Sequence, residues 1–328
     1  MTISRRQVLA ALGAAPVVLA LPRSAFAAYP DRPIHLVVPF APGGNADAVG
    51  RIVAEEMHKA LGQPVIVDNR GGAGGSIGAE AVAKSTPDGY TLLVASNGPM
   101  TVNPFVQAKL GYDPLKDFAA VALTSYVPHC LAVHPSVGVK TLGELIALSK
   151  SKSVNIATSG VGSATHLTLA RFNAATGANL THVPYRSGGQ LLPDLLSGSV
   201  QGAMTEFSIA LPQHQGGKIQ IVGVASAQRS KLAPEIPTFI QGGVKDFTAH
   251  SYIGIVAPAK TPPAIIARLQ RAIGDGLSGN SSAADKLRTM GSDVATPEEM
   301  TAAGFASYIK VEYQRSAAAA KVAGLTPK

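Results

Sequence analysis

The stretch VVPFAPGGNADAVGR, residues 37–51, places a turn rich in Pro and Gly between an apolar run and a helical pattern. The apolar run begins at Ile34 and favours a strand. The apolar spacing that follows favours a helix as far as Leu61, with Asn45 as its N-cap. A strand, a glycine turn and a helix in this order are the repeating unit of α/β proteins. The turn is therefore expected beyond the carboxyl end of a strand, where open α/β sheets bind ligands.

The first 27 residues have the layout of a cleavable export signal. Arg5 and Arg6 precede an apolar run, and small residues surround Phe26 near an expected cleavage point at Ala27. The Arg pair also fits a twin-arginine signal, so both export routes stay open. Removing this segment, which carries three Arg and no acid, lowers the formal net charge from +8 to +5. We therefore predict a mildly basic protein of the periplasm.

The composition bears on disulfide bonds, on the number of domains and on nucleic-acid binding. Cys130 is the single cysteine, so an intramolecular disulfide cannot form and the fold must rely on its core. A chain of about 300 residues can bury such a core and often divides into two domains. The basic residues form no cluster interleaved with aromatic residues, which argues against nucleic-acid binding.

The strand, turn and helix unit recurs along the chain. Strands are expected at 34–40, 64–69, 90–96, 130–134, 154–158, 217–226 and 251–258. Helices are expected at 46–61, 76–84, 141–150 and from Pro262 onward. The third helix opens with a capping box from Thr141 to Glu144. Because the alternation starts again near residue 130, it predicts two α/β lobes, each a mainly parallel sheet flanked by helices.

Five strand-to-helix turns are rich in Gly, Ser, Thr and Asn. They lie at residues 42–45, 71–76, 96–99, 159–165 and 186–189. Backbone N–H groups at such turns, together with the N-termini of the following helices, bind anions without a buried Lys or Arg. Any one of these turns is equally well explained as a tight connection. Five of them in two lobes favour a shared site for a carboxylate or a phosphate.

The sequence lacks the common nucleotide and zinc motifs. Residues 69–78, NRGGAGGSIG, fail the dinucleotide spacing because Ile77 stands where a third Gly is needed. No His pair has zinc-binding spacing, and we expect no metal and no cofactor. The pattern Gly-x-Ser-x-Gly around Ser76, followed by Asp246 and His250, leaves a secreted serine hydrolase as an alternative. Ser76 is poorly placed for that role, because a glycine loop separates it from the expected strand.

From Tyr29 to its C-terminus the chain resembles the extracytoplasmic solute-binding proteins of the tripartite tricarboxylate transporter family. The matching stretches include YPDRPIHLVVPFAPGGNADAVGR, DNRGGAGGSIGAE, PDGYTLLVASNG, SGVGSATHL, VPYRSGGQLLPDLLSG and GIVAPAKTP. The resemblance implies a two-lobed Venus flytrap that captures a small organic carboxylate without catalysis. It also implies that a membrane permease receives this ligand.

The lobes are expected to meet at two crossovers, near residues 126–130 and 248–252. Residues 28–128 together with 252–328 would form lobe 1, and residues 129–251 would form lobe 2. We expect the protein to be a monomer.

The resemblance also points to residues that would hold the ligand. Lobe 1 would contribute Phe40, Ala41, Gly43, Gly44, Asn45, Asp47, Ser96 and Asn97. Lobe 2 would contribute Gly162, Ser163, Ala164, Thr165, His166 and Tyr185. The hydroxyls of Ser163 and Thr165 are expected to donate to the carboxylate. His166 is equally well explained as a brace of its turn, and Asn45 as the cap of its helix.

Glu206 is a further candidate because it follows a strand-like run, at the sheet edge where ligands bind. A solvated loop acid is the alternative. The chain departs from the family pattern nearby, with Gln201 in place of an Asp, and at Tyr252, where many members have Trp. The identity of the ligand therefore does not follow from the resemblance. Neither does the choice between a transport receptor and a protein that feeds a sensor kinase.

Overall fold

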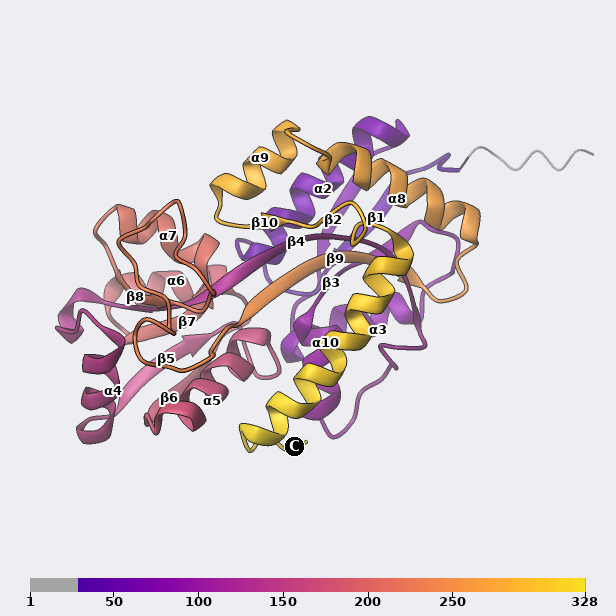
Figure 1. Cartoon of the computed structure of the whole chain (residues 1–328). Coiled ribbons are helices and arrows are strands. Elements are labelled where there is room, and N and C mark those ends of the chain that lie inside the picture. The colour runs from indigo at the N-terminus through magenta and orange to yellow at the C-terminus, as the bar shows by residue number, and fades with distance from the viewer. Residues whose placement is uncertain (1–28, 328) are drawn as a thin grey trace, which may run out of the picture.

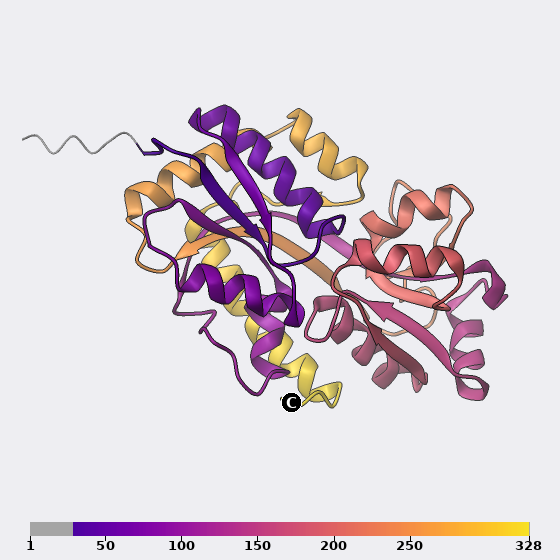
Figure 2. The ribbon, with the colours of Figure 1, turned by 180° about the vertical axis from the view of Figure 1, so that it is seen from behind.

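The computed structural model describes residues 29–327, and the expected export segment at 1–27 lies outside them. Two lobes lie side by side, joined by the long strands β4 (Phe118–Val133) and β9 (His250–Pro258) (Figure 1). The view from behind shows the same division (Figure 2). Helices flank a sheet in each lobe, so the expected two-lobed α/β fold is confirmed.

In the first lobe, β1 (Ile34–Val38) lies between two parallel neighbours, β2 (Val65–Asn69) and β3 (Thr91–Ser96). β9 continues the sheet antiparallel to β3, and β4 pairs antiparallel with β9. The short β10 (Asp293–Val294) pairs with the other side of β4. Almost every residue of β1 and β3 is buried, because helices cover both faces of this sheet.

Five longer helices belong to this part of the chain. They are α2 (Asn45–Leu61), α3 (Ser76–Ala83), α8 (Pro263–Leu277), α9 (Ser282–Thr289) and α10 (Ala302–Val322). Their apolar faces complete one core with the strands, in which Met57, Ile273 and Phe305 are fully buried. α10 then runs on toward the second lobe (Figure 1), where Ala320 packs with Leu167. Short helical turns follow β2 and β3: η1 (Ala73–Gly75), η2 (Gly98–Val102) and η3 (Asn103–Phe105).

The second lobe repeats the arrangement. β5 (Val154–Thr158) lies between β6 (Leu180–Pro184) and β7 (Gly202–Glu206), both parallel to it. The second half of β4 pairs antiparallel with β7 and with β8 (Gln220–Val224). The helical elements are η4 (Pro135–Val137), α4 (Leu142–Ser151), α5 (Ala164–Thr176), α6 (Gly188–Ser197) and α7 (Phe207–Gln215). Leu131, Ile156, Phe172 and Phe239 are fully buried in the core of this lobe.

β4 serves both lobes. Its first half pairs with β9 and its second half with β7 and β8, so one strand enters two sheets. Residues 126–128 of β4 pair with residues 250–252 of β9, which places two hydrogen-bonded strands between the lobes. Each sheet is therefore mixed: in the first lobe β9 runs against β3 and β4, and in the second lobe β4 runs against β7 and β8.

One of the two predicted helix N-caps is present in the structure, and the other is not. Thr141 caps α4, because its Oγ1 accepts a hydrogen bond from Glu144 N at 3.2 Å. The Glu144 carboxylate accepts from Lys140 N at 2.6 Å. The expected N-cap role of Asn45 is wrong, because α2 begins at Asn45 and Gly44 is its cap, without a side-chain bond. The amide of Asn45 is thereby available for other contacts.

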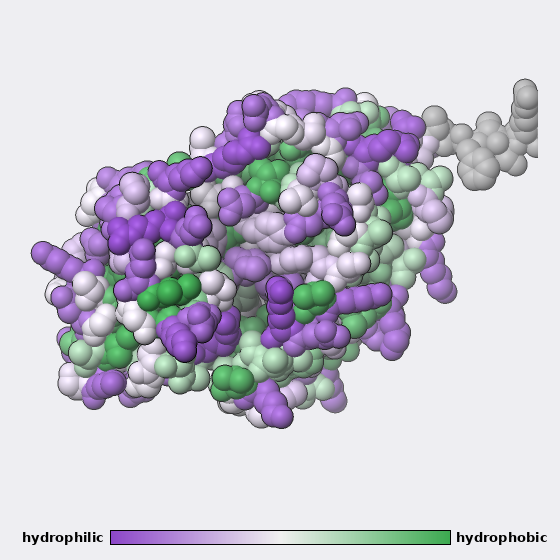
Figure 3. Space-filling view, in the orientation of Figure 1, coloured by the Kyte–Doolittle hydropathy of each residue, from purple (hydrophilic) through white to green (hydrophobic). Residues whose placement is uncertain are grey.

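The face of the molecule seen in Figure 1 is predominantly hydrophilic. Its apolar side chains lie in small separate groups (Figure 3), as is normal for a protein surface. Within residues 29–327, no helix combines the length and the apolar content needed to cross a bilayer.

Candidate functional site

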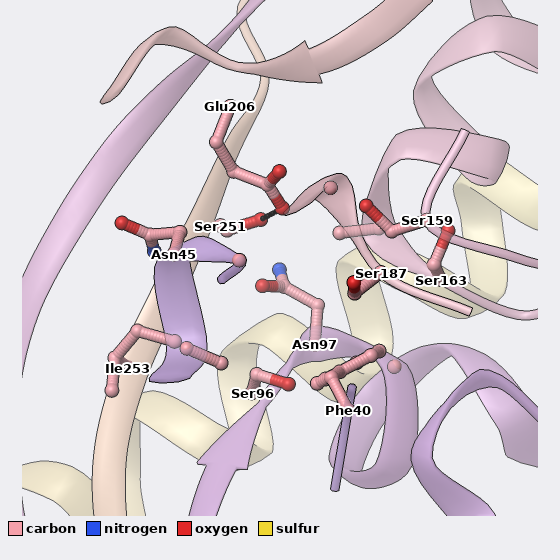
Figure 4. A pocket seen from close by; sticks show the side chains of 15 residues that line it. Phe40, Asn45, Ser96, Asn97, Ser159, Ser163, Ser187, Glu206, Ser251 and Ile253 are labelled. Atoms are coloured by element: carbon pink, nitrogen blue, oxygen red, sulfur yellow. Dashed lines mark hydrogen bonds between the residues drawn. The ribbon is translucent and has the colours of Figure 1, made fainter. Parts of the chain in front are cut away.

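A small cavity lies between the two lobes, mostly at the carboxyl ends of strands from both sheets (Figure 4). Its lining residues are Phe40, Gly44, Asn45, Ala46, Ser96, Asn97, Gly98, Ser159, Ser163, Ala164, Ser187, Gly188, Glu206, Ser251 and Ile253. The cavity offers about 30 Å³ to the centre of a water-sized sphere, which is room for roughly two water molecules. Entry of a ligand therefore requires the lobes to open.

Three helices begin at the wall of this cavity: α2 at Asn45, α5 at Ala164 and α6 at Gly188. The first N–H groups of a helix have no partner within it, and the aligned peptide dipoles make this end positive. Ser163 and Ser187 cap α5 and α6, and each accepts a hydrogen bond of 3.2 Å from the third N–H of its helix. The earlier N–H groups are left for an anion.

Three polar atoms of the cavity wall are buried without a hydrogen-bond partner within the described chain. They are Asn45 Nδ2, Ser96 Oγ and Ser159 Oγ. The amide of Asn45 is fixed by Ser208, whose hydroxyl donates to Asn45 Oδ1 at 3.0 Å. An unpaired buried polar group costs about 1–3 kcal/mol. Three of them at one cavity indicate that a polar ligand completes their hydrogen bonds.

Asn97 has a different role in the same wall. Its Oδ1 accepts from Tyr252 N at 3.0 Å, and its Nδ2 donates to His250 O at 3.4 Å. Both partners lie at the start of β9. Asn97 therefore ties the end of β3 to the crossover strand.

Glu206, the last residue of β7, is the one charged side chain among the lining residues. Its Oε1 accepts from Ser251 Oγ at 3.2 Å and its Oε2 from Thr205 Oγ1 at 3.4 Å. Burial raises the pKa of the Glu206 carboxyl, and its hydrogen bonds offset part of that effect. The carboxylate points into the cavity, opposite Phe40 and Ser96 (Figure 4).

A chain of buried hydrogen bonds lies behind Glu206. His129 Nε2 contacts Ser251 Oγ at 2.8 Å, and His129 Nδ1 contacts Thr168 Oγ1 at the same distance. Thr168 Oγ1 also lies 3.0 Å from Ala164 O. Burial lowers the pKa of His129 to about 3, so this imidazole is neutral at physiological pH. The chain joins β4, β9 and α5 behind the site.

The lobes touch around the cavity. A Cβ atom on Gly189 of α6 would lie 2.5 Å from the carbonyl carbon of Gly43, in the turn after β1. A Cβ atom on Gly74 would lie 2.4 Å from Val161 O, in the turn after β5. Both approaches require the missing side chain of glycine. Together with the bond between Ser208 and Asn45, these contacts describe a closed pair of lobes.

The structure brings together part of the predicted ligand site. The predicted residues that line the cavity are Phe40, Gly44, Asn45, Ser96, Asn97, Ser163, Ala164 and Glu206. The predicted residues outside the lining are Ala41, Gly43, Asp47, Gly162, Thr165, His166 and Tyr185. Most of the residues outside the lining support the turns that carry the lining residues.

Asp47 supports the turn after β1. It accepts from Gly43 N at 3.1 Å and from Asn69 Nδ2 at 3.0 Å, and it pairs with Arg51 at 3.0 Å. Burial alone would raise the pKa of Asp47, but the hydrogen bonds from Arg51, Gly43 and Asn69 hold it below its usual range. Its carboxylate is thus occupied within lobe 1.

Thr165 and Tyr185 also have partners within their own lobe. Thr165 Oγ1 accepts from Ser159 N at 3.0 Å and is fully buried, so this oxygen has a partner within its own turn. The hydroxyl of Tyr185 donates to Asp194 of α6, and Tyr185 is not among the residues that line the cavity.

His166 lies behind the turn before α5. Its ring stacks on His182 with the ring centres 4.3 Å apart, and Gly162 N donates to its Nδ1 at 3.3 Å. These contacts agree with the bracing role that the sequence left open.

The lining also includes residues that were not predicted: Ala46, Gly98, Ser159, Ser187, Gly188, Ser251 and Ile253. Ala46 adjoins a glycine-rich turn, and the next four lie within such turns, so the signal for these five was present. Ser251 and Ile253 lie inside β9, where no motif marks them. Only the pairing of β9 with β3 and β4 brings them to the cavity.

Ser76 and His250, two residues of the alternative hydrolase, have other hydrogen-bond partners. Ser76 Oγ donates to Gln107 Oε1 and accepts from Asn103 Nδ2, both at 2.8 Å. His250 Nε2 contacts Tyr308 OH at 2.9 Å. The Ser76 hydroxyl is therefore hydrogen-bonded to side-chain amides of its own lobe, and these contacts are not those of an activated nucleophile.

A closed cavity between two α/β lobes, with helix N-termini directed at it, defines the class of solute-binding proteins. This chain belongs to the tripartite tricarboxylate transporter family of receptors, whose profile matches residues 49–325. Protein BugT of Bordetella pertussis is 34% identical over 299 residues, which cover 90% of each chain.

Solved structures show the same fold. R. palustris Rpa4515 with adipate has a TM-score of 0.87 and 31% identity, and the match covers 92% of this chain and 100% of that one. MatC (Rpa3494) from Rhodopseudomonas palustris with bound malate has a TM-score of 0.85 and 32% identity, covering 89% and 99%. Both relatives thus hold small carboxylates.

Proposed function

We propose that this protein captures a small organic carboxylate outside the cytoplasm and delivers it to the membrane permease of a tripartite transporter. It does so as a monomer and without a cofactor. Residues 28–128 with 252–328, and residues 129–251, act as two bodies that close on the ligand. The segment at 1–27 directs export and is removed near Ala27.

One observation carries this proposal. The N-termini of three helices and three unpaired buried polar atoms meet at a single cavity whose lining contains no Lys or Arg. Such a set of N–H and hydroxyl donors fits a carboxylate. The adipate and malate held by the two relatives support the same ligand class.

A catalytic function has one observation in its favour. Ser251 Oγ lies 2.8 Å from His129 Nε2 at the cavity, which is the geometry of a nucleophile and its base. The pKa of His129, lowered to about 3, makes this imidazole a weak base at neutral pH. The pair is better explained as part of the buried chain that supports Glu206.

The decisive experiment is native mass spectrometry of the protein as purified from the periplasm. We expect a monomer that starts near residue 28 and carries a small acid, released unchanged on denaturation. The identified acid should raise the melting temperature of the ligand-free protein and should not be consumed. A covalently modified protein or a chemically altered ligand would favour the enzyme instead.

The identity of the membrane partner distinguishes a transport receptor from a protein that feeds a sensor. Crosslinking of the ligand-loaded protein in membranes should capture a permease subunit. Capture of a receptor kinase in its place would show that the protein feeds a sensor.

A further inference from the structure

Glu206 places an acid in a cavity that otherwise offers hydrogen-bond donors. The N-termini of α2 and α5 are directed at the cavity, and Asn45, Ser96 and Ser159 have unpaired polar atoms in its wall. The carboxylate of Glu206 points into the same cavity, opposite Phe40 and Ser96 (Figure 4). Its Oε2 lies so close to the start of α6 that a Cβ atom on Gly188 would be 3.1 Å away. A ligand that spans the cavity therefore meets an anion site and an acid.

No positive side chain compensates Glu206. Its described partners are the hydroxyls of Ser251 and Thr205, and no Lys or Arg of residues 29–327 pairs with it. The titratable groups that face it lie on β4, where His129 is its register partner and Cys130 is the next residue. Burial lowers the pKa of His129 to about 3 and raises that of the Cys130 thiol, so both are neutral. A partly buried carboxylate without a counter-charge is costly.

We propose that the ligand is an amino carboxylate, whose carboxylate lies at the N-termini of α2 and α5 and whose ammonium group lies against Glu206. This inference rests on the proposed function as a carboxylate receptor. An ammonium group supplies the missing counter-charge and up to three donors for the lone pairs that Ser251 and Thr205 leave open. A second ligand carboxylate at this place meets a like charge. A hydroxyl donates one hydrogen bond but leaves the charge uncompensated.

The test compares ligands that differ only at one end. Ligand-free protein is titrated calorimetrically with 6-aminohexanoate, 6-hydroxyhexanoate, hexanoate and adipate, and with the matching four- and five-carbon sets. At the chain length that fits, we expect the ammonium member to bind at least tenfold more tightly than its dicarboxylate counterpart. The hydroxyl member should lie between the ammonium and the methyl members.

Glu206→Gln keeps the side-chain size and removes the charge. In this variant we expect the amino carboxylate to bind at least tenfold more weakly, and the dicarboxylate to bind as well as before or better. Ser163→Ala, at the N-terminus of α5 in the cavity wall, is the matched control. It should weaken all four members of a set by similar factors.

Titration in two buffers of different ionisation enthalpy completes the experiment, because it counts the protons taken up on binding. We expect none for the amino carboxylate. Tight dicarboxylate binding with uptake of one proton, lost in Glu206→Gln, shows instead that Glu206 is a protonated acid. That result, or equal affinity for all members of a set, overturns the inference but leaves the carboxylate receptor intact. Failure of every carboxylate to bind overturns both.

Discussion

The hydroxyl of Ser208 in α7 donates a 3.0 Å hydrogen bond to Oδ1 of Asn45, the first residue of α2, and this bond joins the two lobes. Ser208→Ala removes it and should favour the open state. A hydrogen bond of this kind contributes about 1 kcal/mol, so we expect the dissociation constant of the ligand to rise about fivefold. Calorimetry measures this change. The melting temperature of the ligand-free protein should stay nearly constant, and a large loss of stability would contradict the assignment to closure.

Gly189→Ala should obstruct closure without harming the fold. A methyl group at this position would lie 2.5 Å from the backbone of Gly43 in the closed state, whereas alanine in a helix stabilises the folded chain by up to about 1 kcal/mol. We therefore expect at least a tenfold loss of affinity with no fall in melting temperature. Small-angle scattering should show a radius of gyration that no longer contracts on adding ligand.

Gly274→Ala provides the matched control for this variant. Gly274 lies within α8, and an added Cβ atom would meet no heavy atom within 4 Å. It should gain the same helix stabilisation and bind ligand normally. Equal affinities in the two variants would show that Gly43 and Gly189 do not meet in the ligand-bound state.

Ser163 and Thr165 should respond differently to truncation, although both hydroxyls lie in one turn. Ser163 lines the cavity and caps α5, so Ser163→Ala should weaken binding by about 1.5–3 kcal/mol, as for hydrogen bonds to a charged group. Thr165 Oγ1 accepts from Ser159 N behind the wall. Thr165→Ala should therefore lower the melting temperature more than the affinity.

Arg70→Ala is the control for these hydroxyl variants. Arg70 forms an exposed ion pair with Asp68 at 2.8 Å and does not line the cavity. Exposed pairs of this kind contribute about 0–1 kcal/mol to stability, and we expect unchanged affinity. Loss of binding in Arg70→Ala, with both hydroxyl variants silent, would contradict the site.

Stability should depend on pH through His129. Its pKa is lowered to about 3 in the folded protein by burial, against about 6.5 in an unfolded chain. Between these values the unfolded state binds the extra proton, so stability is lost as pH falls through this window, by about 1.4 kcal/mol per pH unit from this residue. Urea unfolding between pH 4.5 and 7.5 should show a shallower slope for His129→Gln. Identical slopes would rule out the neutral buried imidazole.

The sequence by itself determined the repeating unit and the turns. Apolar periodicity predicted α2, β2 and β5 to within one residue and β1 to within two, because these elements bury one side or both faces against a core. Glycine-rich turns marked the places where helices α2, α5 and α6 begin. The conformation of a turn depends on a few neighbouring residues, so it can be predicted from them.

Only the tertiary structure decided which side chains meet. Ser251 and Glu206 are 45 residues apart and share a hydrogen bond because β4 pairs with both β7 and β9. Thr165 and Ser163 lie two positions apart in one turn, yet one faces the wall and the other the cavity. The direction of a side chain within a turn depends on the partner its hydroxyl finds. Sheet register and lobe closure determine which hydrogen-bond partner is within reach. Neither can be predicted from the local sequence.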